Sequence, residues 1–255
     1  MKRLVLAFAA LVWSAAGTFA TEAEDAQRYA ACMEHARAAP ADGLAEAEAW
    51  LTQSETVAGR HCRAVALIGL GRDEQAVAAL DALGRQMEVH DPALAADLYR
   101  QAATVEFDAG RLDAASVLQD RAFKLAPDSV ELLIDRALLF GARGDYAKAL
   151  QTLERARVLA PARADVLVLT ASAHRPLGHR QLAEESLGAA LALDPGNVAA
   201  LLEHGILRRL GGDDEGARAD WERVRALAPG SPEAETAAAN LKLLDEPGPT
   251  GEPTQ

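Results

Sequence analysis

Residues 130–163 read VELLIDRALLFGARGDYAKALQTLERARVLAPAR, and the pattern in this stretch decides the fold. Its apolar residues Leu133, Ala137 and Phe140 recur every three or four positions, which is the spacing of one face of a helix. Gly144 then interrupts the pattern, and glycine readily takes the positive φ with which many helices end. The first half of the stretch therefore predicts a helix followed by a tight turn.

The second half of the stretch predicts a matching helix. Ala149, Leu153 and Ala156 form another apolar stripe, and Pro161 follows its end because proline cannot continue a helix. The small side chains of Ala137 and Ala149 let the two helix backbones approach closely, while larger side chains fill the space beside them. We expect an antiparallel pair of helices.

The same pattern recurs with a period of 34 residues, in four copies and without an insertion. The main columns are Gly110, Gly144, Gly178 and Gly212; Ala115, Ala149, Ala183 and Ala217; Leu125, Leu159, Leu193 and Leu227; and Pro127, Pro161, Pro195 and Pro229. Two small columns are Ala103, Ala137, Ala171 and Gly205, and Ala122, Ala156, Ala190 and Val224. An unrelated helical bundle of accidental regularity is the alternative to a true repeat.

The length and pattern of this repeat resemble the tetratricopeptide repeat (TPR) family. The resemblance implies an all-α, TPR-type α-solenoid, in which antiparallel helix pairs form a right-handed superhelix. We expect this organisation: a signal peptide (1–20), a degenerate N-terminal helical pair (21–56), a TPR-like unit (57–90), four repeats (96–129, 130–163, 164–197 and 198–231), a C-terminal capping helix (232–244) and a disordered tail (245–255).

The repeat pattern loosens toward the N-terminus. The separation from Gly71 to Gly110 exceeds the period by about five residues, which places an insertion around residues 88–92. Before that unit, residues 25–38 and 44–51 read as two helices joined around Pro40 to Gly43. At the other end, Ser231 and Pro232 form an N-cap and first-turn pair that opens the capping helix.

The first twenty residues predict an export signal. Lys2 and Arg3 precede an apolar run from Leu4 to Ala16, and small residues at Thr18 and Ala20 suit a cleavage site after Ala20. The run is shorter than the roughly 20 residues that a membrane helix needs, although an uncleaved anchor is the alternative. We expect the mature chain in the periplasm, with no membrane span after cleavage of the signal.

The charge of the chain argues against nucleic acid as a partner. Lys and Arg number 26 and Asp and Glu 38, for a formal net charge of −12, whereas a general phosphate-backbone binder needs a basic surface. An acidic exterior keeps a helical repeat soluble, and attraction to a basic partner is the alternative explanation.

Cys32 and Cys62 are the only cysteines, and both fall on predicted helices. In an exported protein two such cysteines most often form a disulfide, which is our expectation here. His35 lies on the same helical face as Cys32, and His61 adjoins Cys62, so a metal-binding or thiol-redox site is the alternative. Adjacent helical residues point about 100° apart, which disfavours joint ligation by His61 and Cys62.

We expect no enzyme activity and no cofactor. The sequence contains no G-x-S-x-G, H-E-x-x-H or P-loop motif, and the remaining histidines have no recurring Ser, Cys or Asp partner. His174 occupies the large position that Phe140 fills one repeat earlier, and Pro176 should kink or shorten the same helix. Local drift in one repeat explains this change, with a distorted groove as the alternative.

In TPR proteins the first helices of the repeats line a concave groove that holds peptide segments of partners. The equivalent positions here are Asp97, Arg100, Thr104 and Phe107; Glu131, Ile134 and Leu138; Asp165, Val168, Ser172 and Arg175; and Leu202, Ile206 and Arg209. The alternative is that the aliphatic residues among them, such as Ile134, Val168 and Leu202, pack within the solenoid instead of facing a ligand.

The groove chemistry narrows the expected partner. The Lys and Asn clamp with which some family members hold a chaperone's C-terminal carboxylate is absent from these positions. An extended or helical ligand with apolar anchors fits the resemblance better. We therefore expect a non-catalytic interaction module or scaffold that binds a protein or peptide ligand in the cell envelope.

Overall fold

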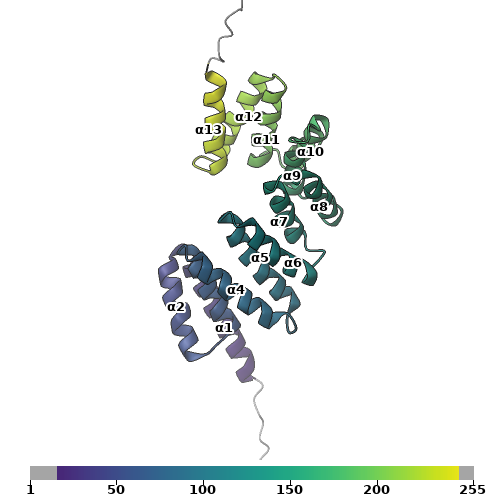
Figure 1. Cartoon of the computed structure of the whole chain (residues 1–255). Helices are drawn as coiled ribbons and strands as arrows, with labels where there is room; N and C mark the ends of the chain where they lie inside the picture. The colour runs from purple at the N-terminus through teal and green to yellow at the C-terminus, as the bar shows by residue number, and fades with distance from the viewer. Residues whose placement is uncertain (1–15, 247–255) are drawn as a thin grey trace, which may run out of the picture. The chain divides into compact units, whose positions relative to one another are not determined.

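The computed structural model describes residues 16–246, in which it places thirteen α-helices and no strand (Figure 1). Residues 1–15 and 247–255 lie outside the described part, and they hold most of the predicted signal peptide and of the predicted tail. Among the residues described, none of the helices combines the length and apolar character that crossing a bilayer requires. The expected all-α fold is confirmed.

The chain divides into two compact units, residues 1–86 and residues 87–255. The division falls beside residues 88–91, which separate α4 (Asp73–Met87) from α5 (Pro92–Asp108). This is the place where the sequence pattern predicts an insertion. The extra residues therefore coincide with the break between two units, and each unit is described separately below.

Unit 1 contains α1 (Ala16–Ala38), α2 (Pro40–Gln53), α3 (Val57–Gly69) and most of α4. Its core gathers Cys32, Trp50, Cys62 and Ala76 from these four helices. Trp50 is 1% exposed and is among the largest fully buried side chains.

One prediction for unit 1 is wrong, because residues 40–43 are helical rather than a turn. Only Ala39 separates α1 from α2, and Pro40 occupies the first turn of α2, where its missing N–H costs nothing. A Cβ atom at Gly43 would overlap the backbone of Ala36, so the glycine is needed for the close crossing of α1 and α2 rather than for a turn.

Unit 2 contains four helix pairs and a final single helix. Its helices are α5, α6 (Leu112–Leu125), α7 (Val130–Ala142), α8 (Tyr146–Leu159), α9 (Ala164–His174), α10 (Arg180–Leu193), α11 (Val198–Leu210), α12 (Asp214–Leu227) and α13 (Pro232–Asp245). The first of these begins four residues before the predicted repeat boundary at 96. Asp91 caps it by accepting a hydrogen bond from the Leu94 N–H at 3.0 Å, and Pro92 follows at the first helical position.

The repeated glycines end the first helix of each pair. Gly144 has φ of +77°, and the equivalent glycines of the other pairs have similar values. The N–H of Asp145 donates to the carbonyl of Phe140 at 2.8 Å, which is the long hydrogen bond of a Schellman motif. The predicted turn chemistry is therefore confirmed.

The third pair has the predicted irregularity. Helix α9 ends at His174 and has 11 residues, whereas α7 and α11 each have 13. Pro176 follows immediately after Arg175, the C-cap residue. The helix is shortened, as expected for proline near a helix end.

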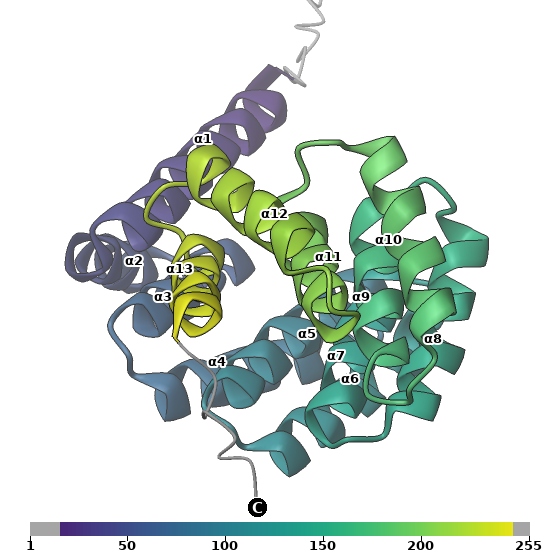
Figure 2. The same ribbon diagram turned by 90° about the horizontal axis from the view of Figure 1, so that it is seen from above.

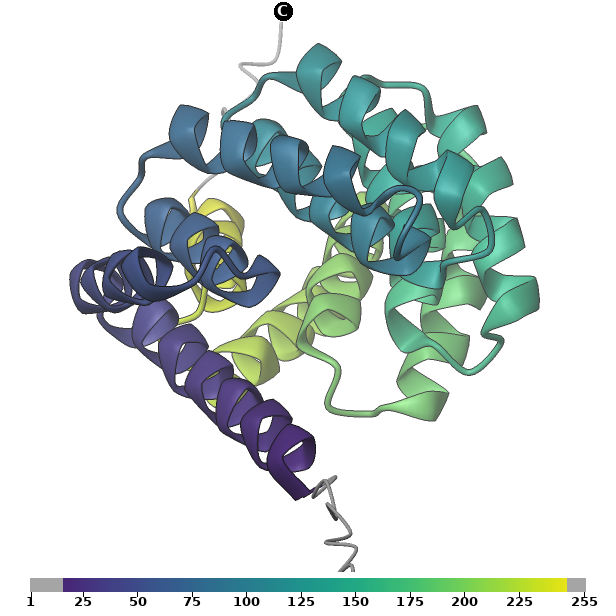
Figure 3. The same ribbon diagram turned by 90° about the horizontal axis from the view of Figure 1, so that it is seen from below.

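Within unit 2 the first helices of neighbouring pairs contact one another in the order α5, α7, α9, α11 and α13. Figures 2 and 3 show the pairs following one another round a curve, and in Figure 2 α9 and α11 lie inside α8 and α10. The capping helix α13 buries Ala237 and Leu241 against Trp221 of α12. Side chains on the inward surface of the first helices are thus brought into one continuous row.

The two helices of the fourth pair pack through different residues from those of the second and third pairs. Those pairs place alanine on the first helix and leucine on the second, as Ala137 with Leu153. In the fourth pair the same two positions hold Gly205 and Trp221, and Trp221 is only 1% exposed. A Cβ atom at Gly205 would overlap the indole ring, whose Nε1 donates to the carbonyl of Leu202 at 3.2 Å. The missing side chain is therefore what accommodates the large ring.

We predict that Gly205→Ala lowers the free energy of unfolding by about 1–3 kcal/mol, the usual cost of overpacking a core. Gly188→Ala is the matched control, because a Cβ atom there meets no atom within 4 Å. It should raise stability by about 0.5–1 kcal/mol, since alanine is the better helix former. Chemical denaturation of both variants measures the two effects.

The double variant Gly205→Ala, Trp221→Leu restores the alanine and leucine of the neighbouring pairs. It should be more stable than the sum of the two single changes predicts, by about 0.5–3 kcal/mol of coupling energy. Equal effects of the two glycine replacements, or simple additivity in the cycle, would show that the ring does not require the glycine.

Candidate functional site

The first helices of unit 2 present a row of charged and apolar side chains, here called the inner face. It comprises Asp97, Arg100, Thr104, Phe107, Asp108, Glu131, Ile134, Asp135, Leu138, Gly141, Ser172, Arg175, Glu203, Leu202, Ile206 and Arg209. These residues come from α5, α7, α9 with its C-cap, and α11. Because those helices contact in sequence, the row continues from one repeat to the next.

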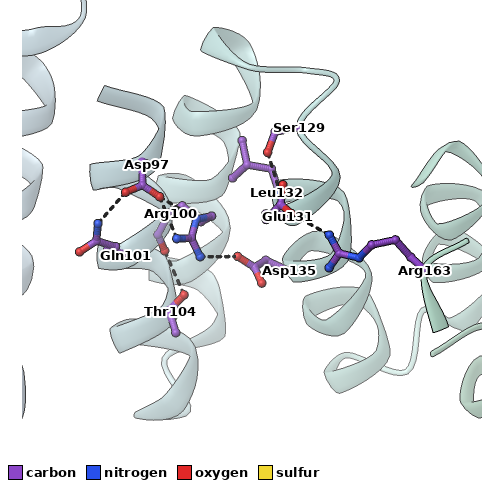
Figure 4. Close-up of polar contacts among 9 residues, drawn as sticks. All are labelled: Asp97, Arg100, Gln101, Thr104, Ser129, Glu131, Leu132, Asp135 and Arg163. Carbon is purple, nitrogen blue, oxygen red and sulfur yellow. Dashed lines mark hydrogen bonds and ion pairs between the residues drawn. The ribbon is translucent and has the colours of Figure 1, made fainter. Parts of the chain in front are cut away.

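A polar network joins α5 to α7 at one end of the inner face (Figure 4). Arg100 donates through Nε and Nη2 to one carboxylate oxygen of Asp97, at 3.0 and 2.8 Å. Gln101 donates to the other oxygen of Asp97 at 2.7 Å. Arg100 also forms an ion pair with Asp135, with 3.6 Å between Nη1 and Oδ2. The guanidinium of Arg100 therefore connects two neighbouring repeats.

A second polar link joins α7 to the start of α9. Arg163 donates to Glu131 at 2.7 Å and to Asp165 at 3.0 and 2.6 Å (Figure 4 shows the link to Glu131). The hydrogen bonds from Arg163 hold the pKa values of both carboxyl groups below their usual range. These acids therefore stay ionised at neutral pH.

The arginines farther along the inner face also have partners within the chain. Arg175 donates to Glu203 on α11 at 3.1 and 3.4 Å, and Arg209 donates to the carbonyl of Leu243 on α13 at 3.3 Å. The family resemblance predicts these two arginines as groove residues that face a ligand. In the structure they tie each first helix to the next.

Asp135 differs from the other acids of the inner face. Burial raises its pKa, the positive charge of Arg100 opposes that rise, and the charges of Glu131 and Asp108 add to it. Its Oδ2 atom is buried and has no hydrogen-bond partner within the chain, since Arg100 Nη1 stands at 3.6 Å. The Asp135 side chain as a whole is 26% exposed, so a cation from solution would meet its exposed part rather than Oδ2.

An apolar pocket of about 300 Å³ opens between α7, α8 and α9. Two of its residues, Ala137 and Leu138, follow Asp135 by two and three positions on α7. The walls of the pocket are Phe107, Ala137, Leu138, Gly141, Ala142, Tyr146, Ala149, Leu153, Leu169, Ser172 and Ala173. Leu138 is 40% exposed. A second depression of about 290 Å³, here called the polar depression, is lined in part by Asp97, Arg100 and Glu131.

Only some of the predicted groove residues line the apolar pocket or the polar depression. Phe107, Leu138 and Ser172 line the apolar pocket, and Arg100 lines the polar depression. Ile134, Leu202 and Ile206 are half-buried, and Thr104 is exposed, with its hydroxyl donating to the carbonyl of Arg100. Val168 is 6% exposed and packs with Ala200 and Leu207 of α11, so it belongs to the core.

Sequence reasoning missed Asp135, Gly141 and Glu203. Asp135 and Leu138 are three residues apart, and Asp135 and Ala142 are seven apart, so helical spacing places them on one face. That spacing could have identified Asp135. The gap left by Gly141 could have been noticed by aligning it with Phe107, Arg175 and Arg209 in the other repeats.

Both cysteines belong to unit 1, whereas the inner face belongs to unit 2. The Sγ atoms of Cys32 and Cys62 stand at disulfide distance, and both residues are fully buried. His35 contacts Glu46 at 2.7 Å, and His61 contacts the Tyr29 hydroxyl at 2.6 Å. In the residues that the structure describes, no group of three or more His, Cys, Asp or Glu side chains is arranged to hold a metal ion.

His174 meets His179 across the turn between α9 and α10, with 3.3 Å between their Nδ1 atoms. Burial lowers the pKa of His174, and the neighbouring His179 lowers it further. The pair belongs to the shortened end of α9.

The raised pKa of Asp135 leads to a prediction about stability. An acid whose pKa is higher in the folded state favours folding below its unfolded pKa and loses that benefit as the pH rises. We therefore expect Asp135→Asn to be more stable than the wild type at pH 7, with the advantage fading near pH 3. Urea unfolding at both pH values measures the difference.

Asp165→Asn supplies a control of opposite sign, because the pKa of Asp165 is lowered by Arg163. The ionised carboxyl stabilises the fold above its unfolded pKa and ceases to do so as the pH falls through the folded pKa. The variant should be less stable at pH 7, and the loss should shrink at low pH. The same sign for both variants at pH 7 would contradict the analysis.

Comparison with known proteins identifies a tetratricopeptide repeat in the chain. The sequence model of the tetratricopeptide repeat matches residues 199–231. Tetratricopeptide repeat protein 36 of Danio rerio is 40% identical over 88 residues, which are 33% of this chain and 47% of the relative. The match thus spans about half the length of that protein.

Solved structures share the fold at low sequence identity. A tetratricopeptide repeat protein from Parabacteroides merdae has a TM-score of 0.66 at 14% identity, covering 91% of this chain and 90% of its own. PilF of Pseudomonas aeruginosa has a TM-score of 0.61 at 16% identity, covering 85% and 99%. YrrB, described as a TPR protein with an unusual peptide-binding site, has a TM-score of 0.52 at 18% identity, covering 76% and 96%.

The repeat of 34 residues, its glycine-terminated first helices, the family match and the shared fold agree with one another. Together they support a protein of the tetratricopeptide repeat family, with a family match at residues 199–231 and the fold of other tetratricopeptide repeat proteins.

Proposed function

We propose that this protein is a non-catalytic interaction module, or scaffold, that binds a segment of a partner protein on its inner face. The observation that carries the proposal is the apolar pocket of about 300 Å³ on that face. A pocket with apolar walls and a few polar groups beside it is the usual form of a binding site. A peptide-binding site is described for YrrB, which supports a peptide as the class of ligand for a chain of the same fold.

The charged groups of the inner face support binding rather than catalysis. Arg100, Arg163 and Arg175 are held by carboxylates of neighbouring repeats, and these contacts fix the spacing of the first helices. A rigid surface loses little entropy when a ligand binds, which favours affinity. We expect no cofactor.

The alternative function, metal binding or thiol redox chemistry at Cys32 and Cys62, has less support. His35 and His61 are each hydrogen-bonded to another side chain, Glu46 and Tyr29. Both cysteines are fully buried, whereas reactive thiols are usually accessible.

We propose that the protein works in the cell envelope, in the periplasm, after removal of residues 1–20. The basic start, apolar run and small residues of that segment support export. An oxidising compartment would also allow a structural disulfide between Cys32 and Cys62, whose sulfur atoms stand at bonding distance.

For binding, we predict that Leu138→Glu weakens the affinity for a groove ligand by at least about 30-fold, the effect of losing a hot-spot contact of about 2 kcal/mol. The ligand is a peptide selected on the purified chain from a random peptide library and labelled with fluorescein. Fluorescence anisotropy gives its dissociation constant.

Val158→Glu is the matched control for this prediction. Val158 is 70% exposed on α8, outside the inner face, so the change adds the same charge without touching the pocket. We expect less than about a twofold effect on affinity. Equal effects of the two variants, or no selectable peptide, would refute a binding role for the inner face.

For export, we predict that the chain purified from the periplasm of an expressing bacterium begins at Thr21 and contains no free thiol. Reduction should lower the free energy of unfolding of unit 1 by about 3–4 kcal/mol, because the bond closes a loop of 30 residues in the unfolded chain. N-terminal mass spectrometry, thiol titration and denaturation with and without reductant measure these properties.

The variant Cys32→Ala, Cys62→Ala is the control for reduction. Its stability should be the same with and without reductant. Two titratable thiols in the unreduced wild type, or a metal ion that copurifies with them, would favour the alternative function instead.

A further inference from the structure

The apolar pocket exists because one repeat lacks a side chain that the others have. Gly141 on α7 stands at the register position that Phe107, Arg175 and Arg209 occupy in the other three repeats of unit 2. A Cβ atom placed at Gly141 meets no atom within 4 Å. Glycine in a helix costs about 0.5–1 kcal/mol relative to alanine, and no close backbone approach requires it here. The position therefore carries a cost in stability that packing does not explain.

The space at Gly141 suits a single large apolar side chain. Its volume of about 300 Å³ lies at the lower end of the range for ligand sites, and its walls are almost entirely hydrocarbon. The ring of Phe107 and the side chains of Leu138 and Leu169 line it, and Tyr146 stands at the start of α8. An inserted leucine, methionine or phenylalanine would remove these apolar surfaces from water.

The chemistry beside the pocket favours a cation. Asp135 lies about one helical turn before Leu138, and its side chain is 26% exposed although one carboxylate oxygen is buried opposite Arg100. Asp97, Asp108, Glu131 and Asp165 bring further carboxylates to the same side of the unit, against the guanidinium groups of Arg100 and Arg163. The uncompensated charge is negative, so an acidic segment would be repelled.

The spacing of these features fixes the spacing of the ligand groups. Six helical residues separate Asp135 from Gly141, a rise of about 9 Å at 1.5 Å per residue. An extended peptide covers about 3.3 Å per residue, so about three residues span the same distance. A basic side chain about three positions from the apolar one can reach Asp135.

We propose that the inner face selects an extended, basic segment of a partner protein, in which one large apolar side chain enters the Gly141 pocket and a Lys or Arg about three residues away pairs with Asp135. This inference rests on the proposed binding function and gives it a specificity. Gly141 is the specificity-determining residue, because filling its space closes the pocket.

The experiment starts from a random peptide library displayed on phage and panned on the full chain. Peptides that bind should be enriched in a large apolar residue about three positions from a Lys or Arg. A labelled peptide of this kind should lose at least about tenfold in affinity for Gly141→Phe, which introduces the side chain of Phe107 at the equivalent position.

Gly188→Phe is the matched control. Gly188 lies in the interior of α10, is exposed, and likewise has no atom within 4 Å of a Cβ atom. Its affinity for the peptide should stay within about twofold of the wild type. Circular dichroism and a melting curve establish that both variants are folded.

Two further measurements separate the two halves of the proposal. Replacing the apolar residue of the peptide by alanine should weaken binding to the wild type but add little to the loss in Gly141→Phe. Asp135→Asn should weaken binding of the basic peptide by at least about threefold at low salt, with a smaller difference at high salt.

The outcomes distinguish this inference from the proposed function. Peptides that depend on Leu138 but are acidic, or that bind Gly141→Phe as well as the wild type, would overturn the inference and leave the binding function standing. Failure to select any peptide, or selection of peptides that ignore Leu138→Glu, would overturn the proposed function as well.

Discussion

The close contact between the two helices of each pair is the constraint on which unit 2 depends. It requires a small residue on the first helix and another on the second, as Ala137 and Ala149 show with almost no exposed surface. A glycine with positive φ then ends each first helix, and these glycines recur every 34 residues from Gly110 to Gly212. Because the repeat period is constant, equivalent positions of successive first helices fall side by side and form the inner face.

That regularity explains how much of the fold the sequence could predict. The columns at Gly144, Ala149 and Pro161 identify both helices of a repeat and the turn between them, since each reflects a local backbone requirement. The shortening of α9 before Pro176 follows for the same reason. In unit 1 the repeat pattern is weak, and Gly43 looks like a turn residue although its role is the close approach of Ala36.

The candidate site was harder to predict because it depends on contacts between repeats. A register transferred from the family names Val168 as a groove residue, but Ala200 and Leu207 of the next first helix cover it. The arginines were expected to face a ligand, yet Arg175 is already held by Glu203. Asp135 and Gly141 were missed because one depends on its burial and the other on the absence of a side chain.

The pairing of Gly205 with Trp221 also limits how such a chain can be rearranged. Repeats that share a length look exchangeable, and helices α7 and α9 could be expected to substitute for α11. The alanine that either helix carries at this position would meet the indole of α12. Duplication or shuffling can therefore preserve the fold only when it moves a complete helix pair. In this chain the helix pair, rather than the single helix, is the smallest segment that can be exchanged without a clash.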